Sequence, residues 1–258
     1  MSFFFDRIGS ADPEIGEYVK AMEGQISNQF RIVPGFGPNC INSSKSTRIN
    51  YFEFSNITMM DESNGYDSIA EIYIRGRGRA VNGIGSSTAR AWARTFNMGS
   101  VILDLGSGTG IPVTKILLEA GLKAYAVDAS PKMVADFRQN FPNIPVSCES
   151  VERSLFFNRG FDGIISVGLM FLLPEGTQRV LIPKMAAVLN PGGKLLFTAP
   201  LDKVEWKDAM TEQPSRSLGA EQYRQLILAS GLYIGEEFDD EGGNHYFSGI
   251  RVSSTNSA

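Results

Sequence analysis

One stretch decides the fold of this chain: Val101-Ile102-Leu103-Asp104-Leu105-Gly106-Ser107-Gly108-Thr109-Gly110. An apolar run stops there in three alternating glycines, which predicts a buried strand followed by a tight turn. Glycine adopts positive φ without a Cβ penalty and lets a ligand approach bare backbone. Pro112 suits the first turn of a following helix, whose free N–H groups then face the turn. The stretch therefore predicts the strand, turn and helix start of an α/β nucleotide-binding fold.

The glycine spacing separates two kinds of nucleotide site. A dinucleotide fingerprint, Gly-x-Gly-x-x-Gly, would place its last glycine at position 111, which is isoleucine. The pattern is instead Asp-x-Gly-x-Gly-x-Gly, and Asp104 would repel a pyrophosphate but can hold an ammonium group. This motif resembles the first motif of the class I S-adenosylmethionine-dependent methyltransferases. The resemblance implies a loop around the methionine half of that cofactor, with contacts from Asp104, Gly106, Ser107, Gly108 and Gly110.

The pattern after the glycine turn alternates helix and strand. A second strand over 123–127 ends in Asp128, eighteen residues past Gly110. Adjacent parallel strands end at the same edge of a sheet, so this carboxylate lies beside the glycine loop. It is placed there to accept hydrogen bonds from the 2′- and 3′-hydroxyls of a ribose.

The resemblance implies further cofactor contacts. Met133 would pack on adenine and Glu149 would bind its amino group, although an exposed loop glutamate is the ordinary alternative. A helix over 65–77 would bring Tyr73 to the pocket and Arg77 to the cofactor carboxylate; both of its tyrosines can also be core residues. The remaining implied contacts are Ala129, Ser130, Ser150, Val151 and Gly168.

The rest of the chain completes the sheet. Strands are predicted over 144–148, 161–167 and 195–199, the last after a Leu-x-Pro-Gly-Gly turn. Two closing strands, 232–238 and 246–252, have a short connection and must be antiparallel. Helices are predicted over 86–96, 131–140, 177–190 (interrupted by Pro183) and 220–230, with a long insertion over 201–218. The predicted fold is α/β, a Rossmann-like doubly wound seven-stranded sheet with its last strand antiparallel and an N-terminal extension.

Two parts follow from this pattern: an extension over 1–63 and a cofactor-binding domain over 64–258. Helical spacing predicts a helix over 12–30, and apolar composition a strand over 49–60. The extension lies outside the resemblance. Three interpretations remain open for it: a lid over the active site, a dimerisation arm that would make a homodimer, or packing on the sheet edge.

The loop after the fourth strand bears on the acceptor. It reads Gly168-Leu169-Met170-Phe171, whereas family members that methylate base amino groups carry Asn-Pro-Pro-Tyr or a close variant. This difference argues against a nucleic-acid amine and for an apolar or aromatic acceptor. Candidate acceptor contacts are Tyr66, Leu169, Met170, Trp206 and His245.

Two of these residues are also candidate catalytic groups. His245 is the only histidine of the chain, and an imidazole suits a general base near neutral pH. A solitary histidine beside a hairpin turn is, however, more often structural. Tyr66 is the second candidate, with a core tyrosine as the alternative.

Composition limits the function classes. A net charge of −4 over 258 residues gives no sign of a nucleic-acid partner. Cys40 and Cys148 form no disulfide framework and no Cys/His spacing suggests a metal site, which favours a cytoplasmic location. No signal peptide and no membrane-spanning run are recognised.

The sequence thus predicts an S-adenosylmethionine-dependent methyltransferase that acts on a small-molecule acceptor. A nicotinamide-dependent oxidoreductase is an alternative, against which Ile111 and the absence of a Tyr-x-x-x-Lys pair count. A non-catalytic cofactor-binding regulatory protein is another.

Overall fold

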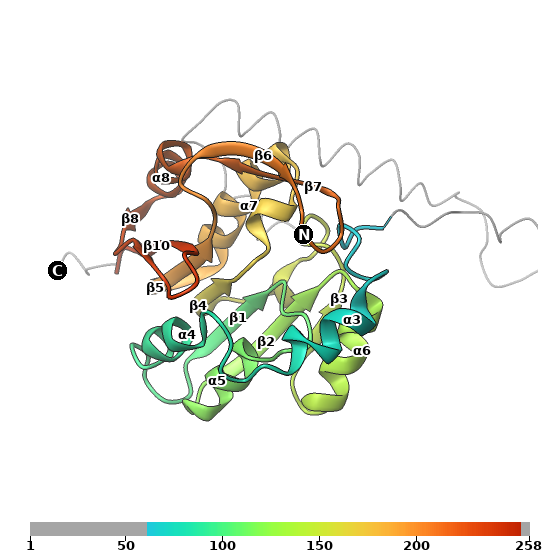
Figure 1. The fold of residues 1–258 in the computed structure, drawn as a ribbon. Coiled ribbons are helices and arrows are strands. Elements are labelled where there is room, and N and C mark those ends of the chain that lie inside the picture. Colours follow the sequence, from blue (N-terminus) through green and yellow to red (C-terminus); the bar gives the residue numbers. More distant parts are fainter. Residues whose placement is uncertain (1–60, 254–258) are drawn as a thin grey trace, which may run out of the picture.

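The computed structural model describes residues 61–253 (Figure 1). The predicted helix over 12–30 and the predicted strand over 49–60 lie outside the described residues. Within the described part, no helix is long and apolar enough to cross a membrane.

The central sheet has its parallel strands in the order β3-β2-β1-β4-β5, followed by β10 and β8. The strands run over Val101–Leu105 (β1), Lys123–Asp128 (β2), Val146–Cys148 (β3), Phe161–Ser166 (β4), Leu189–Thr198 (β5), Leu232–Ile234 (β8), Phe238–Asp239 (β9) and His245–Arg251 (β10). β1 pairs in parallel with β2 on one side and with β4 on the other, so the strand order reverses direction between β1 and β4. The predicted doubly wound sheet is therefore confirmed, and it has a switch point at the carboxyl end of β1.

The antiparallel end of the sheet differs in detail from the prediction. β10 is antiparallel to β5, as predicted for the last strand. The single strand predicted over 232–238 is split into β8 and β9, which both pair with β10. The sheet thus has eight strands instead of seven. The break follows Gly235, where the Ser248 hydroxyl donates to the Glu236 carbonyl and ends the regular ladder.

Helices cover both faces of the sheet (Figure 1). They run over Ala70–Arg75 (α3), Ser86–Ala93 (α4), Val113–Glu119 (α5), Pro131–Asn140 (α6), Glu175–Val188 (α7) and Ala220–Ala229 (α8), with short 3₁₀ turns at Arg77–Arg79 (η1), Phe156–Asn158 (η2) and Met170–Leu172 (η3). Buried side chains of α7 and α8 form one apolar core with the sheet, and α4 and α5 form a second core on the other face. Both faces of the parallel strands are buried, which explains their nearly continuous apolar sequence.

Two predictions about α7 and β5 were wrong. Pro183 does not interrupt α7, which continues from Glu175 to Val188. Buried residues on both sides of the proline, Ile182 and Met185 among them, hold the helix on the sheet. The Pro-Gly-Gly segment is not a turn before β5 but an irregularity within it, because the β4–β5 register shifts between Phe161 and Gly163.

The insertion over 201–218 forms an antiparallel hairpin, β6 (Lys203–Lys207) and β7 (Pro214–Leu218). The sequence indicated only a polar insertion there, since two of the three buried positions of β7 are the serines 215 and 217, and only Leu218 is apolar. The Ser217 hydroxyl donates to the Pro200 carbonyl at 2.8 Å, so this buried hydroxyl has a hydrogen-bond partner. The turn of this hairpin lies above the carboxyl ends of the parallel strands (Figure 1).

Candidate active site

A cavity of about 930 Å³ lies at the carboxyl ends of the parallel strands. Open α/β sheets bind ligands at this position. The glycine-loop half of the cavity is formed by the ends of β1, β2 and β3, and it includes Gly106, Gly108, Asp128, Met133 and Ser150. The hairpin half is formed by residues on segments far apart in the chain, Tyr66, Leu169, Phe171, Leu172, Asp208 and Met210.

The glycine loop is a tight backbone turn anchored to β2. The N–H groups of Gly106 and Ser107 both donate to the Val127 carbonyl, at 2.9 and 3.2 Å. Gly106, Gly108 and Gly110 have φ of 71°, 54° and 79°, which explains the three glycines of the motif. A Cβ on Gly108 would meet only the edge of the Tyr73 ring at 3.9 Å, so bare backbone faces open space there.

The third glycine of the motif has a different role. A Cβ on Gly110 would come within 2.5 Å of the Phe141 ring and 2.8 Å of the Phe137 ring. Gly110 therefore packs the loop against α6 instead of lining the cavity.

Two acids lie in the last residues of the neighbouring strands β1 and β2, but their surroundings differ. Asp128 lines the cavity, and its two oxygens accept hydrogen bonds from the N–H groups of Ser130 and Gly108, both at 2.8 Å. Burial raises the pKa of Asp128, and these two hydrogen bonds oppose that effect. Each carboxylate oxygen has two lone pairs, so Asp128 can accept further bonds from a ligand.

Asp104 lies outside the residues that line the cavity. It is 2% exposed, and it accepts a hydrogen bond from the Thr114 hydroxyl at 2.7 Å. Burial raises the pKa of Asp104 to about 7, although the bond from Thr114 opposes this shift. Asp104 thus ties the end of β1 to α5, beneath the glycine loop.

The far wall of the glycine-loop half is the loop after β3. Glu149, Ser150 and Val151 line the cavity, opposite the buried side chain of Met133. Lys184 of α7 supports this loop from behind, since its ammonium donates to the Val151 and Glu152 carbonyls at 2.6 and 3.0 Å. Burial lowers the pKa of Lys184 to about 8, and the nearby acids oppose the shift.

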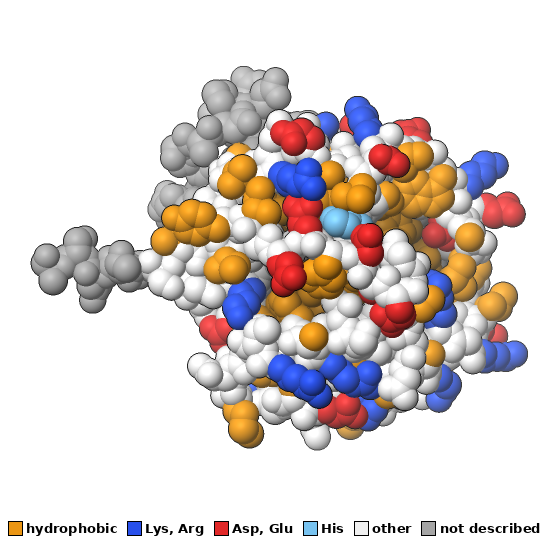
Figure 2. Space-filling model, turned by 60° about the vertical axis from the view of Figure 1, so that its left-hand side comes forward, with side chains coloured by type: hydrophobic (Ala, Val, Ile, Leu, Met, Phe, Trp, Pro, Cys, Tyr) orange, Lys and Arg blue, Asp and Glu red, His pale blue; other side chains and the backbone are white. Residues whose placement is uncertain are grey.

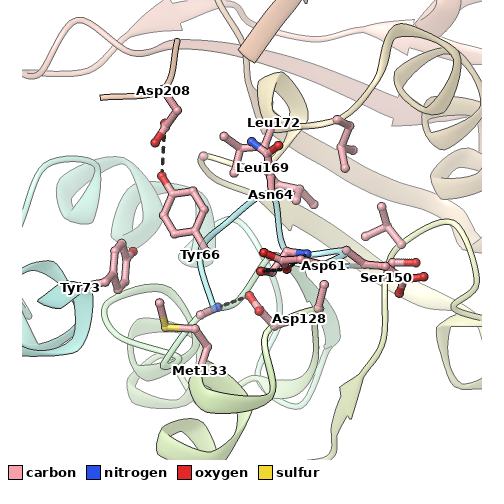
Figure 3. A pocket seen from close by; sticks show the side chains of 18 of the residues that line it. Asp61, Asn64, Tyr66, Tyr73, Asp128, Met133, Ser150, Leu169, Leu172 and Asp208 are labelled. Atoms are coloured by element: carbon pink, nitrogen blue, oxygen red, sulfur yellow. Dashed lines mark hydrogen bonds between the residues drawn. The ribbon is translucent and has the colours of Figure 1, made fainter. Parts of the chain in front are cut away.

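The hairpin half is aromatic and apolar, with one polar pair. The Tyr66 hydroxyl points at the Asp208 carboxylate and donates to it at 3.4 Å (Figure 3). The ring of Tyr66 also meets the ring of Tyr73 edge-on, with centroids 5.9 Å apart. Burial raises the pKa of Tyr66, and the charge of Asp208 adds to this effect, so Tyr66 remains protonated and can donate.

A short segment over 61–66 closes this side of the cavity. It is fixed at both ends: the Arg153 side chain pairs with Glu62, and the Asp67 carboxylate accepts from Ser130 Oγ and from the N–H of Lys132. Asp61, Glu62 and Ser63, which fall within the predicted extension, are among the cavity residues.

The structure brings thirteen of the twenty predicted site residues to the cavity. These are Tyr66, Tyr73, Arg77, Gly106, Gly108, Asp128, Ala129, Met133, Glu149, Ser150, Val151, Gly168 and Leu169. The seven others do not line it, namely Asp104, Ser107, Gly110, Ser130, Met170, Trp206 and His245. Ser130 instead caps α6, where its hydroxyl accepts from the N–H of Met133, and Trp206 packs on Phe171 behind the cavity wall.

His245 is held in a cluster of its own. Its Nδ1 lies 2.7 Å from an Asp239 oxygen and its Nε2 lies 3.4 Å from a Glu237 oxygen, while its ring packs edge-on against Phe247. Figure 2 shows this face, with the histidine among acidic side chains. No residue of this cluster lines the cavity. A catalytic role of His245 stays a prediction, and in this geometry the histidine does not reach the cavity.

Sequence reasoning assigned no role to three groups that the structure brings to the site. Asp208 and Met210 lie in a polar insertion whose hairpin the sequence did not reveal. Lys184 gives no signal, because a lysine on an amphipathic helix is ordinarily solvated. The position of residues 61–64 over the cavity depends in part on the ion pair between Arg153 and Glu62, which no local pattern indicates.

The model of the methyltransferase-domain family matches residues 102–193. Among curated relatives, the ribosomal RNA small subunit methyltransferase G of Magnetococcus marinus is 26% identical over 141 residues, which cover 49% of this chain and 64% of that protein. An uncharacterized methyltransferase of Bacillus thuringiensis is 30% identical over 96 residues, 37% of this chain and 45% of that protein. The chain therefore spans less than two thirds of the length of these relatives.

Solved structures share the fold at low identity. The 1,6-didemethyltoxoflavin-N1-methyltransferase of Burkholderia thailandensis superposes with a TM-score of 0.58 at 17% identity, covering 83% of this chain and 94% of that one. The magnesium protoporphyrin IX methyltransferase of Synechocystis with bound S-adenosylmethionine gives 0.53 at 15% identity, covering 72% and 96%. Residues 102–193 thus match the methyltransferase-domain family, and the fold around them is shared with methyltransferases of solved structure that bind S-adenosylmethionine or S-adenosylhomocysteine.

Proposed function

We propose that this protein transfers the methyl group of S-adenosylmethionine to a small-molecule acceptor. One observation carries the proposal: the cavity described above has two chemically different halves, whose walls meet where Leu169 packs on Gly106. The glycine-loop half suits a nucleoside with a charged amino-acid tail. The hairpin half suits an apolar or aromatic molecule beside it.

The residues of the glycine-loop half fit the cofactor. Side chains at Gly108 and Gly168 would project into free space in the cavity wall, so the backbone there leaves room for a ligand. Asp128 would accept hydrogen bonds from the ribose hydroxyls, and Met133 and Val151 would enclose adenine. Arg77 would approach the carboxylate, and Glu149 the adenine amino group. The bound cofactor supplies an activated methyl group on a good leaving group.

The protein's own contribution is placement. Alignment of two reactants is worth roughly 7–11 kcal/mol in favourable systems, more than one general base typically adds. Tyr66 and Leu169 would hold the acceptor, and the segment over 61–66 would exclude water. A catalytic triad is therefore not required.

The charge of the cavity supports a small acceptor. Six acidic residues line it, Asp61, Glu62, Asp128, Glu149, Glu152 and Asp208, against the two basic residues Arg77 and Arg153. An acidic entrance repels phosphates, and RNA binding depends on basic surface. The relative from Magnetococcus marinus is named as a ribosomal RNA methyltransferase, so RNA is the alternative acceptor that the experiment must compare with small molecules. The nicotinamide alternative is not favoured, because the matched domain family is that of methyltransferases.

The test has two stages on the full chain. Calorimetric titration with S-adenosylhomocysteine should give one-site binding in the micromolar range. Labelled S-adenosylmethionine is then incubated with a panel of small aromatic compounds and, separately, with deproteinised ribosomal RNA. Label in a small molecule supports the proposal, and label in RNA alone contradicts it. Binding without transfer to either would favour the non-catalytic regulatory interpretation.

A further inference from the structure

The hairpin half of the cavity carries one unexplained acid. Asp208 is 8% exposed, lies just after β6 and faces the cavity opposite the glycine loop (Figure 3). A buried carboxylate needs partners to offset its desolvation. The distribution of those partners over its two oxygens is uneven.

Oxygen Oδ1 is fully used by the hairpin turn. It accepts from the N–H groups of Met210 and Thr211, at 3.0 and 2.8 Å, and from the Thr211 hydroxyl at 3.1 Å. Among residues 61–253, oxygen Oδ2 accepts only the long bond from the Tyr66 hydroxyl, at 3.4 Å. One oxygen thus builds the turn, and the other has lone-pair capacity left toward the cavity.

The surroundings of Oδ2 restrict what can bind there. The nearby cavity walls are apolar or aromatic, from Leu169, Phe171 and Leu172. A second anion would meet the charge of Asp208 at low dielectric, so an acceptor carboxylate or phosphate is disfavoured. A donor group on a flat apolar molecule satisfies both the oxygen and the walls.

We propose that Asp208 binds the N–H group of an aromatic amine acceptor through Oδ2 and receives its proton during methyl transfer. The inference rests on the proposed function and names the substrate class for the same site. Tyr66 holds the free Asp208 oxygen in place before the acceptor enters.

The chemistry explains why nitrogen suits this site better than oxygen. Carboxylates are weak bases and do not deprotonate an alcohol or a phenol before attack. A neutral aromatic amine already has a free lone pair on nitrogen. The nitrogen–carbon bond forms with that pair, the carbon–sulfur bond breaks and leaves its electron pair on sulfur, and the methylated nitrogen becomes an arylammonium whose acidity is comparable to that of a carboxylic acid. Its proton then passes to Asp208, which completes the balance.

The experiment measures binding to the full chain saturated with S-adenosylhomocysteine, so that no turnover is needed. The probes are aminoquinolines, hydroxyquinolines and quinoline carboxylates of matched substitution. The variant Asp208→Asn keeps a carbonyl oxygen for the turn bonds and replaces the free oxygen with a donor. Asp202→Asn, at an exposed position just before the same hairpin, is the matched control.

We expect an aminoquinoline to bind more tightly than its hydroxy and carboxylate analogues. Asp208→Asn should weaken the amine about tenfold, since a hydrogen bond to a charged group is lost, and leave the S-adenosylhomocysteine affinity within about twofold. Asp202→Asn should change neither. In a separate reaction with S-adenosylmethionine in place of S-adenosylhomocysteine, mass spectrometry of the product should place the methyl group on nitrogen.

Two results would overturn the inference while the proposed function stands. One is saturable S-adenosylhomocysteine binding with no aminoquinoline binding, or with preference for the hydroxy or carboxylate probe. The other is an unchanged amine affinity in Asp208→Asn. Failure of S-adenosylhomocysteine itself to bind would instead contradict the proposed function.

Discussion

The two halves of the cavity are built from very different stretches of chain. In the glycine-loop half, Gly108 and its hydrogen-bond acceptor Asp128 are twenty residues apart. In the hairpin half, Tyr66 and Asp208 are 142 residues apart. The glycine loop and Asp128 come from consecutive elements of the chain, β1, its turn and β2. Tyr66 and Asp208 come together only when the whole domain has folded. Cofactor binding therefore has a sequence motif, whereas acceptor binding depends on tertiary contacts.

The largest expected difference between the halves is the effect on cofactor affinity of replacing Asp128 or Asp208, one acid from each half. Asp128→Ala should weaken S-adenosylhomocysteine binding by about 4 kcal/mol, roughly a thousandfold, because two hydrogen bonds to a charged group are lost. Calorimetric titration measures this affinity, and denaturant unfolding verifies the fold. Asp208→Asn in the other half is the matched control. Equal losses in the two variants would mean that the halves do not act separately.

The buried acid beneath the glycine loop predicts a pH dependence of stability. Burial raises the pKa of Asp104 from 3.8 to about 7, so the folded state holds this proton more tightly than the unfolded state. The stabilising effect is fully present below pH 3.8 and is lost as pH rises through 7. At pH 8, the ligand-free variant Asp104→Asn should exceed the wild type by about 4 kcal/mol in unfolding free energy.

Urea unfolding at pH 4 and pH 8 tests the Asp104 prediction. The two proteins should differ little at pH 4, where the carboxyl group is largely protonated in the folded state. A constant difference across this range would show that Asp104 does not titrate in it. Glu205→Gln, at an exposed position on β6, serves as the control for general charge effects.

Glycines of positive φ also lie behind the walls of both halves, and the atoms packed against them differ. A Cβ on Gly110 would lie 2.5–2.9 Å from the rings of Phe137 and Phe141, which cannot move without disturbing α6. A Cβ on Gly65 would meet Thr211 at 3.0 Å and the flexible Gln213 side chain at 3.1 Å.

Gly110→Ala should therefore destabilise the protein by about 2–3 kcal/mol and Gly65→Ala by about 1 kcal/mol. Thermal and urea unfolding measure both. Gly99→Ala isolates the backbone cost, because Gly99 has φ of 80° and no atom of the described residues lies within 4 Å of its Cβ position. A Gly65→Ala effect as large as that of Gly110→Ala would contradict the difference in packing.

The smallest effect is expected for the ion pair that fixes the 61–66 segment. Arg153 pairs with Glu62, and their side chains are 60% and 34% exposed. Exposed ion pairs contribute about 0.5 kcal/mol, so Arg153→Gln should weaken S-adenosylhomocysteine about twofold at low salt. High salt should remove the difference from the wild type. Lys115→Gln breaks a pair with Glu119 on α5 and should leave the affinity unchanged.

Local patterns predicted most of the glycine-loop half. Alternating glycines, an acid after β2 and a Ser-Pro helix start each constrain the backbone within a few residues. The same reasoning predicted that Asp104 would hold a ligand's ammonium group, whereas the structure places Asp104 against Thr114 and outside the cavity lining. A motif predicts which residue type lies at the end of a strand. The direction of that side chain depends on the helix that packs against the strand, here α5 with Thr114.

The sequence by itself determined the doubly wound sheet, the glycine loop and the position of Asp128, because these depend on hydrophobic periodicity, glycine conformation and strand order. Only the tertiary structure decided the hairpin β6–β7, the split of the last edge into β8 and β9, and the continuity of α7 through Pro183. It also decided that Asp208 meets Tyr66 and that His245 pairs with Asp239. These features depend on contacts between segments that are distant in the chain. Such contacts stabilise the fold but leave no hydrophobic periodicity in the sequence of either segment alone.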